Sequence, residues 1–367
     1  MIQIISLIIF GLILGAIFVL AFFDHKKQRK LTKYPKISFI IPTYNDADTL
    51  TETIESLYKS YDKRKTELII INDKSTDNTL NILKKLKKKY KFKIINNEKN
   101  LGKVRSLNKA IPLSRGEIVF ILDSDTKLSK RAIESLLARL EAPKVGAVSC
   151  RYEVKNKGII PIMVNIEYSM LALSQSAYNF TSAISLWGGC MAFKRKALQD
   201  IKLFKENMII EDMDAALTLN EKGWKVEQNL IPVETYSPDD IKGWFKQHIR
   251  WSSGGMQCII KHFKVFIKNP LSIFYFLAYG LVSMLFIYSL FSIRLDFLQS
   301  AIIGIVYAIF SLPYVIVNMK GIEEWYKIFL ILPFSFVYYP IFAAVMTIGF
   351  IVGVYKYFKL REGGRGW

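Results

Sequence analysis

The stretch EIVFILDSDTKL, residues 117–128, ends a run of apolar residues in two aspartates one position apart. The continuous apolar run Ile118–Leu122 predicts a short strand buried on both faces. Asp123 and Asp125 follow directly, where a buried strand gains nothing from carboxylates. Two carboxylates at this spacing suit a hard divalent cation such as Mg²⁺ or Mn²⁺. Taken alone, the same D-x-D spacing is also typical of a solvated turn.

Similar apolar runs recur upstream in ISFIIPTYN, ELIIIND and FKIINN, and helical segments separate them. Buried strands alternating with helices predict an α/β fold with a mostly parallel sheet covered on both faces. In such sheets ligands bind beyond the carboxyl ends of the strands. The polar residues that follow the strands are Thr43, Tyr44, Asp73, Asp123 and Asp125. In NLGKVRSLN, Gly102 and Lys103 offer backbone and an ammonium group to a phosphate.

Two further segments carry candidate chemistry. In IIEDMDAALTL, Glu211 and Asp212 open a predicted helix, where they either complement the helix dipole or supply a general base. The segment DDIKGWFKQHIRWSSGG predicts an amphipathic helix lying on a membrane surface. Its Gln247, Arg250 and Trp251 are either anchors or binding residues, and His248 is expected on the helix surface.

Hydrophobic residues make up 51% of the 367 residues, yet 22% are charged. The two values are compatible because the hydrophobic residues are concentrated in a few segments of the chain. We expect a multi-pass integral membrane protein in contact with membrane lipids. The candidate spans are residues 2–23, 271–293, 297–317 and 328–355. The predicted parts are an N-terminal transmembrane helix (1–24), an α/β domain (35–239), interfacial helices (240–268), a C-terminal membrane region of about three segments (269–356) and a basic tail (357–367).

Basic residues just after the first span place the α/β domain in the cytosol by the positive-inside rule. Four crossings would then put the basic tail outside, although its own charges favour the inside, so the side of the tail stays open. The net charge of +20 lies largely in lysine clusters suited to solvent or anionic lipid. No nucleic-acid-binding motif accompanies it, and we expect no nucleic-acid partner. The three cysteines show neither disulfide nor zinc spacing.

Seven motifs occur in a characteristic order: IPTYN, NDKSTDNT, NLGKVRSLN, DSD, WGGCMAFKR, IEDMD and QHIRW. Residues 36–255, which contain them, resemble the membrane-embedded family 2 glycosyltransferases. This group includes hyaluronan, chitin, cellulose and poly-N-acetylglucosamine synthases. The resemblance implies a GT-A fold with flanking transmembrane helices, a divalent cation, and inverting transfer from a nucleotide-activated sugar, usually UDP-linked.

The resemblance also implies roles for individual residues. For the donor, Thr43 and Tyr44 would flank the nucleobase, Asp73 would bond it, Lys103 would approach the diphosphate, Asp123 would contact the nucleotide and Asp125 would bind the metal. For the acceptor, Gly188, Gly189 and Cys190 would line a pocket, and Asp212 would be the base with Glu211 beside it. In the Q-x-x-R-W motif formed by Gln247, Arg250 and Trp251, Trp251 would stack on the acceptor sugar and Arg250 would face the diphosphate.

Three functions follow as hypotheses. The first is a processive synthase that elongates a β-linked glycan and passes it through its own spans. The second is a single transfer to a lipid carrier, such as a polyprenyl phosphate or a glycolipid. The third, a membrane scaffold without activity, conflicts with the intact set of acidic residues. Because few spans are predicted, a translocation channel would need a partner or a second copy, and a homo-oligomer is left open.

Overall fold

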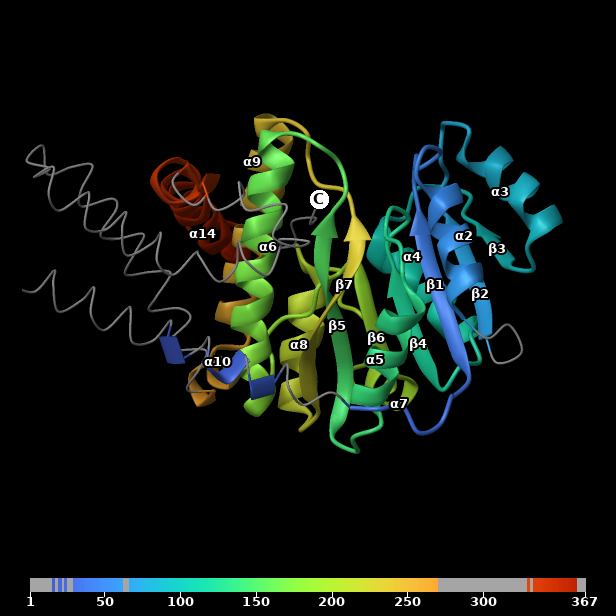
Figure 1. The fold of residues 1–367 in the computed structure, drawn as a ribbon, viewed down its shortest axis with the longest axis horizontal. Helices are drawn as coiled ribbons and strands as arrows, with labels where there is room; N and C mark the ends of the chain where they lie inside the picture. Colours follow the sequence, from blue (N-terminus) through green and yellow to red (C-terminus); the bar gives the residue numbers. More distant parts are fainter. Residues whose placement is uncertain are drawn as a thin grey trace, which may run out of the picture. The chain divides into compact units, whose positions relative to one another are not determined.

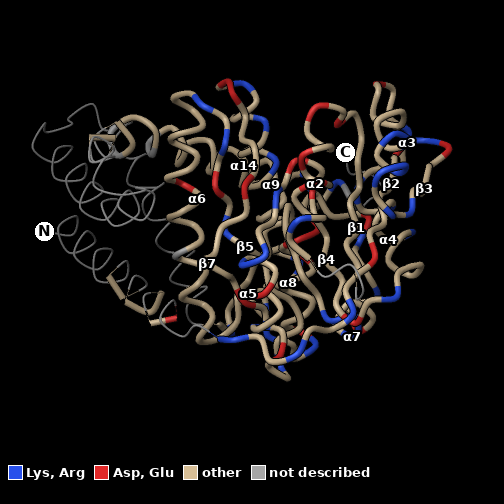
Figure 2. The backbone as a smooth tube through the Cα atoms, turned by 45° about the vertical axis from the view of Figure 1, so that its right-hand side comes forward, with Lys and Arg blue, Asp and Glu red and all other residues tan. Residues whose placement is uncertain are grey.

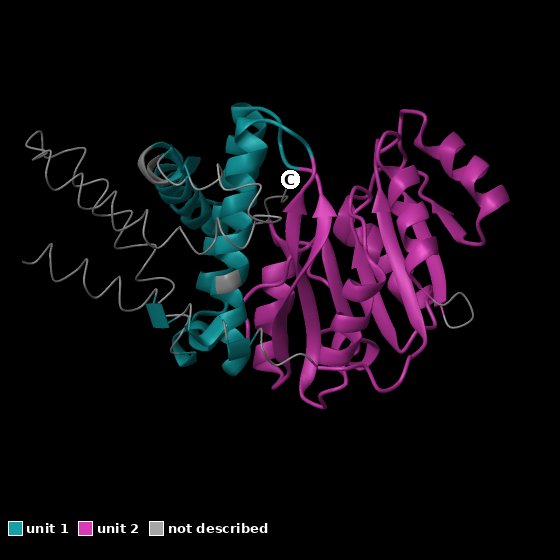
Figure 3. Cartoon of the chain, viewed as in Figure 1, with its two compact units in different colours: residues 1–26, 156–180, 237–367 teal, residues 27–155, 181–236 magenta. Residues whose placement is uncertain are grey.

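The computed structural model describes residues 15–16, 19–21, 23–24, 29–61, 66–269, 329–330 and 333–361. The chain divides into two compact units (Figure 3). The α/β unit comprises residues 27–155 and 181–236, and the helical unit comprises residues 1–26, 156–180 and 237–367. The predicted spans at 271–293 and 297–317, and most of the span at 2–23, lie outside the described residues.

The α/β unit is built on a seven-stranded sheet in the order β3-β2-β1-β4-β6-β5-β7 (Figure 1). The strands are β1 (Ile37–Thr43), β2 (Thr66–Asn72), β3 (Lys93–Asn96), β4 (Ile118–Leu122), β5 (Val145–Val154), β6 (Cys190–Lys194) and β7 (Lys225–Thr235). Of these, β6 runs antiparallel to its neighbours β4 and β5, and the other pairings are parallel. The predicted mostly parallel sheet is confirmed, and β1 to β4 are the four strands expected from the apolar runs.

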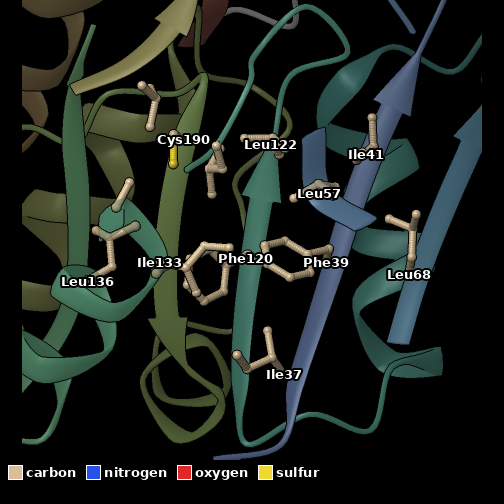
Figure 4. Packing of buried hydrophobic residues seen from close by; sticks show 14 of the residues in the cluster. Ile37, Phe39, Ile41, Leu57, Leu68, Phe120, Leu122, Ile133, Leu136 and Cys190 are labelled. Atoms are coloured by element: carbon tan, nitrogen blue, oxygen red, sulfur yellow. The ribbon is translucent and has the colours of Figure 1, made fainter. Parts of the chain in front are cut away.

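Helices of the α/β unit are α2 (Leu50–Ser60), α3 (Thr79–Lys89), α4 (Lys103–Ala110), α5 (Lys130–Leu140), α7 (Arg195–Asp200) and α8 (Glu211–Glu221), with a 3₁₀ turn η1 (Ile111–Leu113). Successive residues of a strand point to opposite faces of the sheet. In β1 both sets are buried, since Phe39 and Ile40 are each fully inaccessible. On one face Phe39 packs against Phe120 of β4 with ring centroids 4.8 Å apart (Figure 4). Burial on both faces explains why these strands are continuously apolar.

The carboxyl ends of β1, β2 and β4 meet at one edge of the sheet, because the three strands are parallel neighbours. Thr43, the last residue of β1, lies in register with Asn72 at the end of β2. Asp73 and Asp123 therefore begin loops at the same edge, as the sequence predicts. Away from the strand ends, the lysines of α3 are exposed (Figure 2), which agrees with a solvated helix face.

The helical unit contains α6 (Ile159–Ala177), the 3₁₀ turn η2 (Tyr178–Phe180), α9 (Ile241–Lys261), α10 (Phe263–Lys268), the π-helix η4 (Phe334–Tyr338) and α14 (Tyr339–Arg361). Figures 1 and 2 show α6, α9 and α14 side by side. No sequence pattern indicates that α6 groups with the later helices. In the structure, residues 156–180 of the helical unit interrupt the predicted 35–239 domain. In the same unit Asn179 donates to Asp24 at 2.8 Å and is buried.

Small residues let α14 approach α9 closely. A Cβ at Gly349 would overlap Oγ of Ser252, and one at Gly353 would lie 2.5 Å from the carbonyl oxygen of Ser253. The two glycines are four residues apart, which is the spacing by which membrane helices pack at short distance. Among the described residues one helix, Ile341–Lys359, is long and apolar enough to cross a membrane, with a mean hydropathy of 1.8. It overlaps the fourth predicted span, 328–355.

Candidate active site

Lys103 lies at the centre of the predicted site. Its Nζ is 2.8 Å from Oδ1 of Asp123 and 3.1 Å from Oε1 of Glu211. It also donates to the carbonyl oxygen of Gly188 at 3.3 Å. Burial on its own would lower the pKa of Lys103, but the charges of Asp123 and Glu211 outweigh it and raise that pKa above its usual value. Lys103 is therefore a permanent cation among carboxylates from distant parts of the chain.

Asp73 fixes the segment from which Lys103 projects. Its carboxylate accepts hydrogen bonds from the backbone N–H groups of Leu101 at 2.9 Å and Gly102 at 2.7 Å. The side chain of Asn97 donates a third at 2.8 Å. Gly102 has a φ of +82°, a conformation that favours glycine, and α4 begins at the next residue. Asp73 thus orients the first turn of α4, and its predicted contact with a nucleobase stays a prediction.

Asp123 is held by the pairing of β4 with β6. Leu122 pairs with Cys190, and the N–H of Asp123 continues the ladder by donating to the carbonyl oxygen of Gly189 at 3.0 Å. A Cβ at Gly189 would lie 2.8 Å from the hydroxyl oxygen of Tyr152 and 3.3 Å from Oδ2 of Asp123. Only glycine fits this approach without displacement. Tyr152, which the sequence analysis did not identify, accepts a hydrogen bond from the N–H of Gly189.

Asp212 contacts Gly188, the neighbour of Gly189 in the sequence. Its Oδ2 accepts from the N–H of Gly188 at 3.0 Å, and its Oδ1 from the N–H of Met213 at 2.7 Å. A Cβ at Gly188 would lie 2.9 Å from Oδ2 of Asp212 and 3.5 Å from Nζ of Lys103. The structure therefore brings together five predicted residues from four segments of the sequence: Lys103, Asp123, Gly188, Glu211 and Asp212.

Asp125 is the residue best suited to a metal. Burial, and then repulsion from Asp123, raise the pKa of its carboxyl from 3.8 to about 6. A nearby cation would relieve both effects. Among the described residues no group of three or more histidine, cysteine or acidic side chains is placed to hold a metal. The Asp123–Asp125 pair instead fits Mg²⁺ or Mn²⁺, which commonly take one or two protein carboxylates and complete their coordination with substrate phosphates and water.

The predicted nucleobase residues differ in accessibility. Thr43 is buried, and its Oγ1 donates to Oδ2 of Asp46 at 2.8 Å, where the N–H of Tyr44 also donates. Tyr44 itself is 46% exposed. Thr43 therefore orders the loop, and the ring of Tyr44 is accessible to a ligand.

Cys190 does not line an accessible pocket. It is fully buried in the hydrophobic core, and its pKa is raised by hydrogen bonding with Cys150 and by burial. The reason is that Cys190 is the first residue of the interior strand β6, whereas Gly188 and Gly189 precede the strand. The expectation that all three line an acceptor pocket is corrected for Cys190.

Gln247, Arg250 and Trp251 lie on α9 in the helical unit. The predicted segment 240–268 forms α9 and α10, and its position at a membrane surface stays a prediction. The expectation that His248 lies on the helix surface is wrong, because His248 is fully buried against Glu167 of α6 and Phe342 of α14. The roles of the three motif residues stay predictions.

Asp125→Asn is expected to stabilise the metal-free protein at neutral pH. Because the folded chain raises the pKa of this carboxyl, its ionisation opposes folding. The penalty is absent well below pH 4, grows up to about pH 6 and above that reaches ~3 kcal/mol. Thermal unfolding in detergent with a chelator should give a higher midpoint for the variant at pH 7.5 and a difference about one third as large at pH 4.5. Glu134→Gln, at an exposed carboxyl of α5, is the control, and equal midpoints at pH 7.5 would contradict the assignment.

Comparison with known proteins agrees with this geometry. Residues 38–202 match the family described as Glycosyl transferase family 2. The poly-beta-1,6-N-acetyl-D-glucosamine synthase of Staphylococcus aureus (strain MSSA476) is 28% identical over 291 residues, which cover 75% of this chain and 70% of that protein. The synthase of the same name from Staphylococcus epidermidis is 31% identical over 258 residues, covering 69% and 62%.

The fold is also found among solved structures. A mannosyltransferase from Pyrobaculum calidifontis, in complex with GDP-Man and Mn²⁺, superposes with a TM-score of 0.65 and 18% identity, covering 96% of this chain and 99% of that one. This similarity supports the GT-A fold expected from the motifs. With the order of its motifs, its matching segment and its carboxylate-lined sheet edge, the chain carries a glycosyl transferase family 2 domain at residues 38–202.

Proposed function

We propose that the chain elongates a β-linked polysaccharide by inverting transfer from a UDP-sugar, with UDP-N-acetylglucosamine as the first donor to test. The observation that carries the proposal is the convergence of Lys103, Asp123 and Asp212 at the carboxyl edge of the sheet. The choice of sugar rests on relatives that are named as poly-beta-1,6-N-acetyl-D-glucosamine synthases.

In the proposed reaction Asp212 removes the proton from an acceptor hydroxyl as its oxygen attacks the anomeric carbon of the donor sugar. The bond from that carbon to the diphosphate breaks, and the diphosphate leaves with the bonding electron pair. The N–H groups of Gly188 and Met213 hold the carboxylate of Asp212 in a fixed orientation. The ammonium of Lys103 offsets the negative charge of the leaving diphosphate. A divalent cation held by Asp123 and Asp125 would supply further positive charge to the same phosphates.

The remaining residues complete the proposal. Tyr44, with Thr43 ordering its loop, and Asp73 serve the nucleobase; Gly188 and Gly189 border the acceptor; Gln247, Arg250 and Trp251 contact the sugar and the diphosphate. We place the α/β unit in the cytosol and the product on a path through the membrane spans. A single transfer to a lipid carrier, such as a polyprenyl phosphate or a glycolipid, is the alternative.

The direct test uses purified full-length protein in nanodiscs with Mn²⁺ or Mg²⁺. Radiolabelled UDP-GlcNAc, UDP-Glc, UDP-GlcA and GDP-mannose are offered singly and in pairs. Products are sized on gels and extracted into organic solvent. High-mass labelled polymer from UDP-GlcNAc alone is the expected result, and a chelator should abolish it.

A product that carries a single labelled sugar and extracts into organic solvent would contradict processive synthesis and support a single transfer to a lipid carrier. Absence of transfer from every donor, in protein that still binds UDP, would contradict the proposed activity as a whole.

Asp212→Asn should reduce transfer by at least about 10²-fold, since the amide cannot take the acceptor proton. Binding of UDP and Mn²⁺ should stay near the wild-type affinity, because the amide oxygen still accepts the N–H of Gly188. Calorimetric titration with UDP and a radiolabel assay measure the two effects separately. Loss of UDP binding in this variant would remove Asp212 from the role of base.

A further inference from the structure

His248 is a buried residue whose two ring nitrogens both face acceptors. Its Nδ1 lies 2.8 Å from the carbonyl oxygen of Trp244, one turn earlier on α9. Its Nε2 lies 3.0 and 3.1 Å from the two carboxylate oxygens of Glu167 on α6. Carbonyl and carboxylate oxygens accept hydrogen bonds and donate none. The geometry is satisfied when both nitrogens carry hydrogen, so His248 fits this site as an imidazolium cation.

Glu167 joins this cation to a third segment. It is 3% exposed and also accepts a hydrogen bond from the hydroxyl of Tyr338 in η4. The Tyr338 oxygen in turn accepts from Nε1 of Trp244 at 2.7 Å. Each donor in this ring of four side chains has an acceptor. A buried carboxylate without a counter-charge would be costly, and the imidazolium provides that counter-charge. The ring therefore ties α6, α9 and η4 together.

The imidazole also contacts the tryptophan of the Q-x-x-R-W motif. Its ring centroid is 5.0 Å from that of Trp251 and 4.3 Å from that of Trp244. Phe342 of α14 lies 5.6 Å away. A cation at these distances is attracted to the electron-rich faces of tryptophan rings. His248 is thus placed where its charge and position can act on the orientation of Trp251.

We propose that His248 is a positioning residue whose doubly protonated form, paired with Glu167, holds Trp251 for contact with the acceptor. The inference rests on the proposed function, since it uses the role given there to Trp251. It adds that elongation depends on a proton held by a residue other than the base Asp212.

The pH dependence has a definite sign. Burial would lower the pKa of His248, but the charge of Glu167 and its hydrogen bond outweigh burial and raise it above 6.5. Among the described elements, the other titratable groups in and beside this set of four hydrogen-bonded side chains are Glu167 and Tyr168 on α6 and Tyr338 on η4. The pairing is complete below pH 6.5 and is lost as the pH rises through the raised pKa. Elongation should therefore decline on the alkaline side.

The first test locates the proton without relying on activity. Imidazolium quenches the fluorescence of an adjacent tryptophan, so emission of the wild-type protein in nanodiscs should rise with pH around a midpoint above 6.5. Glu167→Gln should lower that midpoint by at least one pH unit. His248→Gln should abolish the transition, whereas Lys246→Gln, a charge loss on the exposed face of α9, should leave it unchanged. A wild-type titration equal to that of His248→Gln would overturn the proposal.

The second test separates positioning from folding. His248→Gln should reduce polymer elongation at least tenfold and leave hydrolysis of the donor nearly unchanged. His248→Arg, which keeps the cation but cannot titrate, should retain elongation and flatten its alkaline decline. Equal loss of elongation and hydrolysis in His248→Gln, with the alkaline decline retained in His248→Arg, would contradict a positioning role. If the wild-type protein transfers no sugar from any donor, the proposed function fails, and the fluorescence titration still decides whether His248 holds the proton.

Discussion

The ion pairs of Lys103 with Asp123 and Glu211 are the interaction on which the site depends. Carboxylates gathered at one edge of a sheet repel one another, and the cost rises as they leave water. Lys103 offsets that repulsion and links the start of α4, the end of β4 and the start of α8. Its position depends in turn on Asp73, which holds the backbone of Gly102 just before α4.

The helical unit follows the same rule with different residues. There the buried carboxylate of Glu167 is balanced by His248, as Asp123 and Glu211 are balanced by Lys103. Each unit thus carries its own charge balance, and each balance lies next to a motif of the family. In the α/β unit the cation stands beside the proposed base, and in the helical unit it stands beside the motif tryptophan. This division matches a reaction in which bond making and the holding of a long acceptor are separate tasks.

Much of the α/β unit was predictable because burial on both faces leaves a local signal. The apolar runs of β1 and β4 identify parallel strands, and parallel strands bring Asp73 and Asp123 to one edge without further information. The position of α6 was not predictable, since a helix that is apolar on most sides has no periodic pattern to fix its partner. His248 and Glu167 are 81 residues apart, and no local rule connects them. The spacing of Gly349 and Gly353, by contrast, is a local sequence signal for the close packing of α14.

The most direct measurement of the central claim is calorimetric titration of UDP into the purified protein with and without Mn²⁺, and into Lys103→Met with Mn²⁺. If the carboxylate edge is a metal-dependent nucleotide site balanced by Lys103, UDP binds with 1:1 stoichiometry when Mn²⁺ is present. Its affinity then falls at least tenfold, or about 1.4 kcal/mol, when either the metal or the ammonium group is removed. Equal UDP affinity under all three conditions would contradict the account.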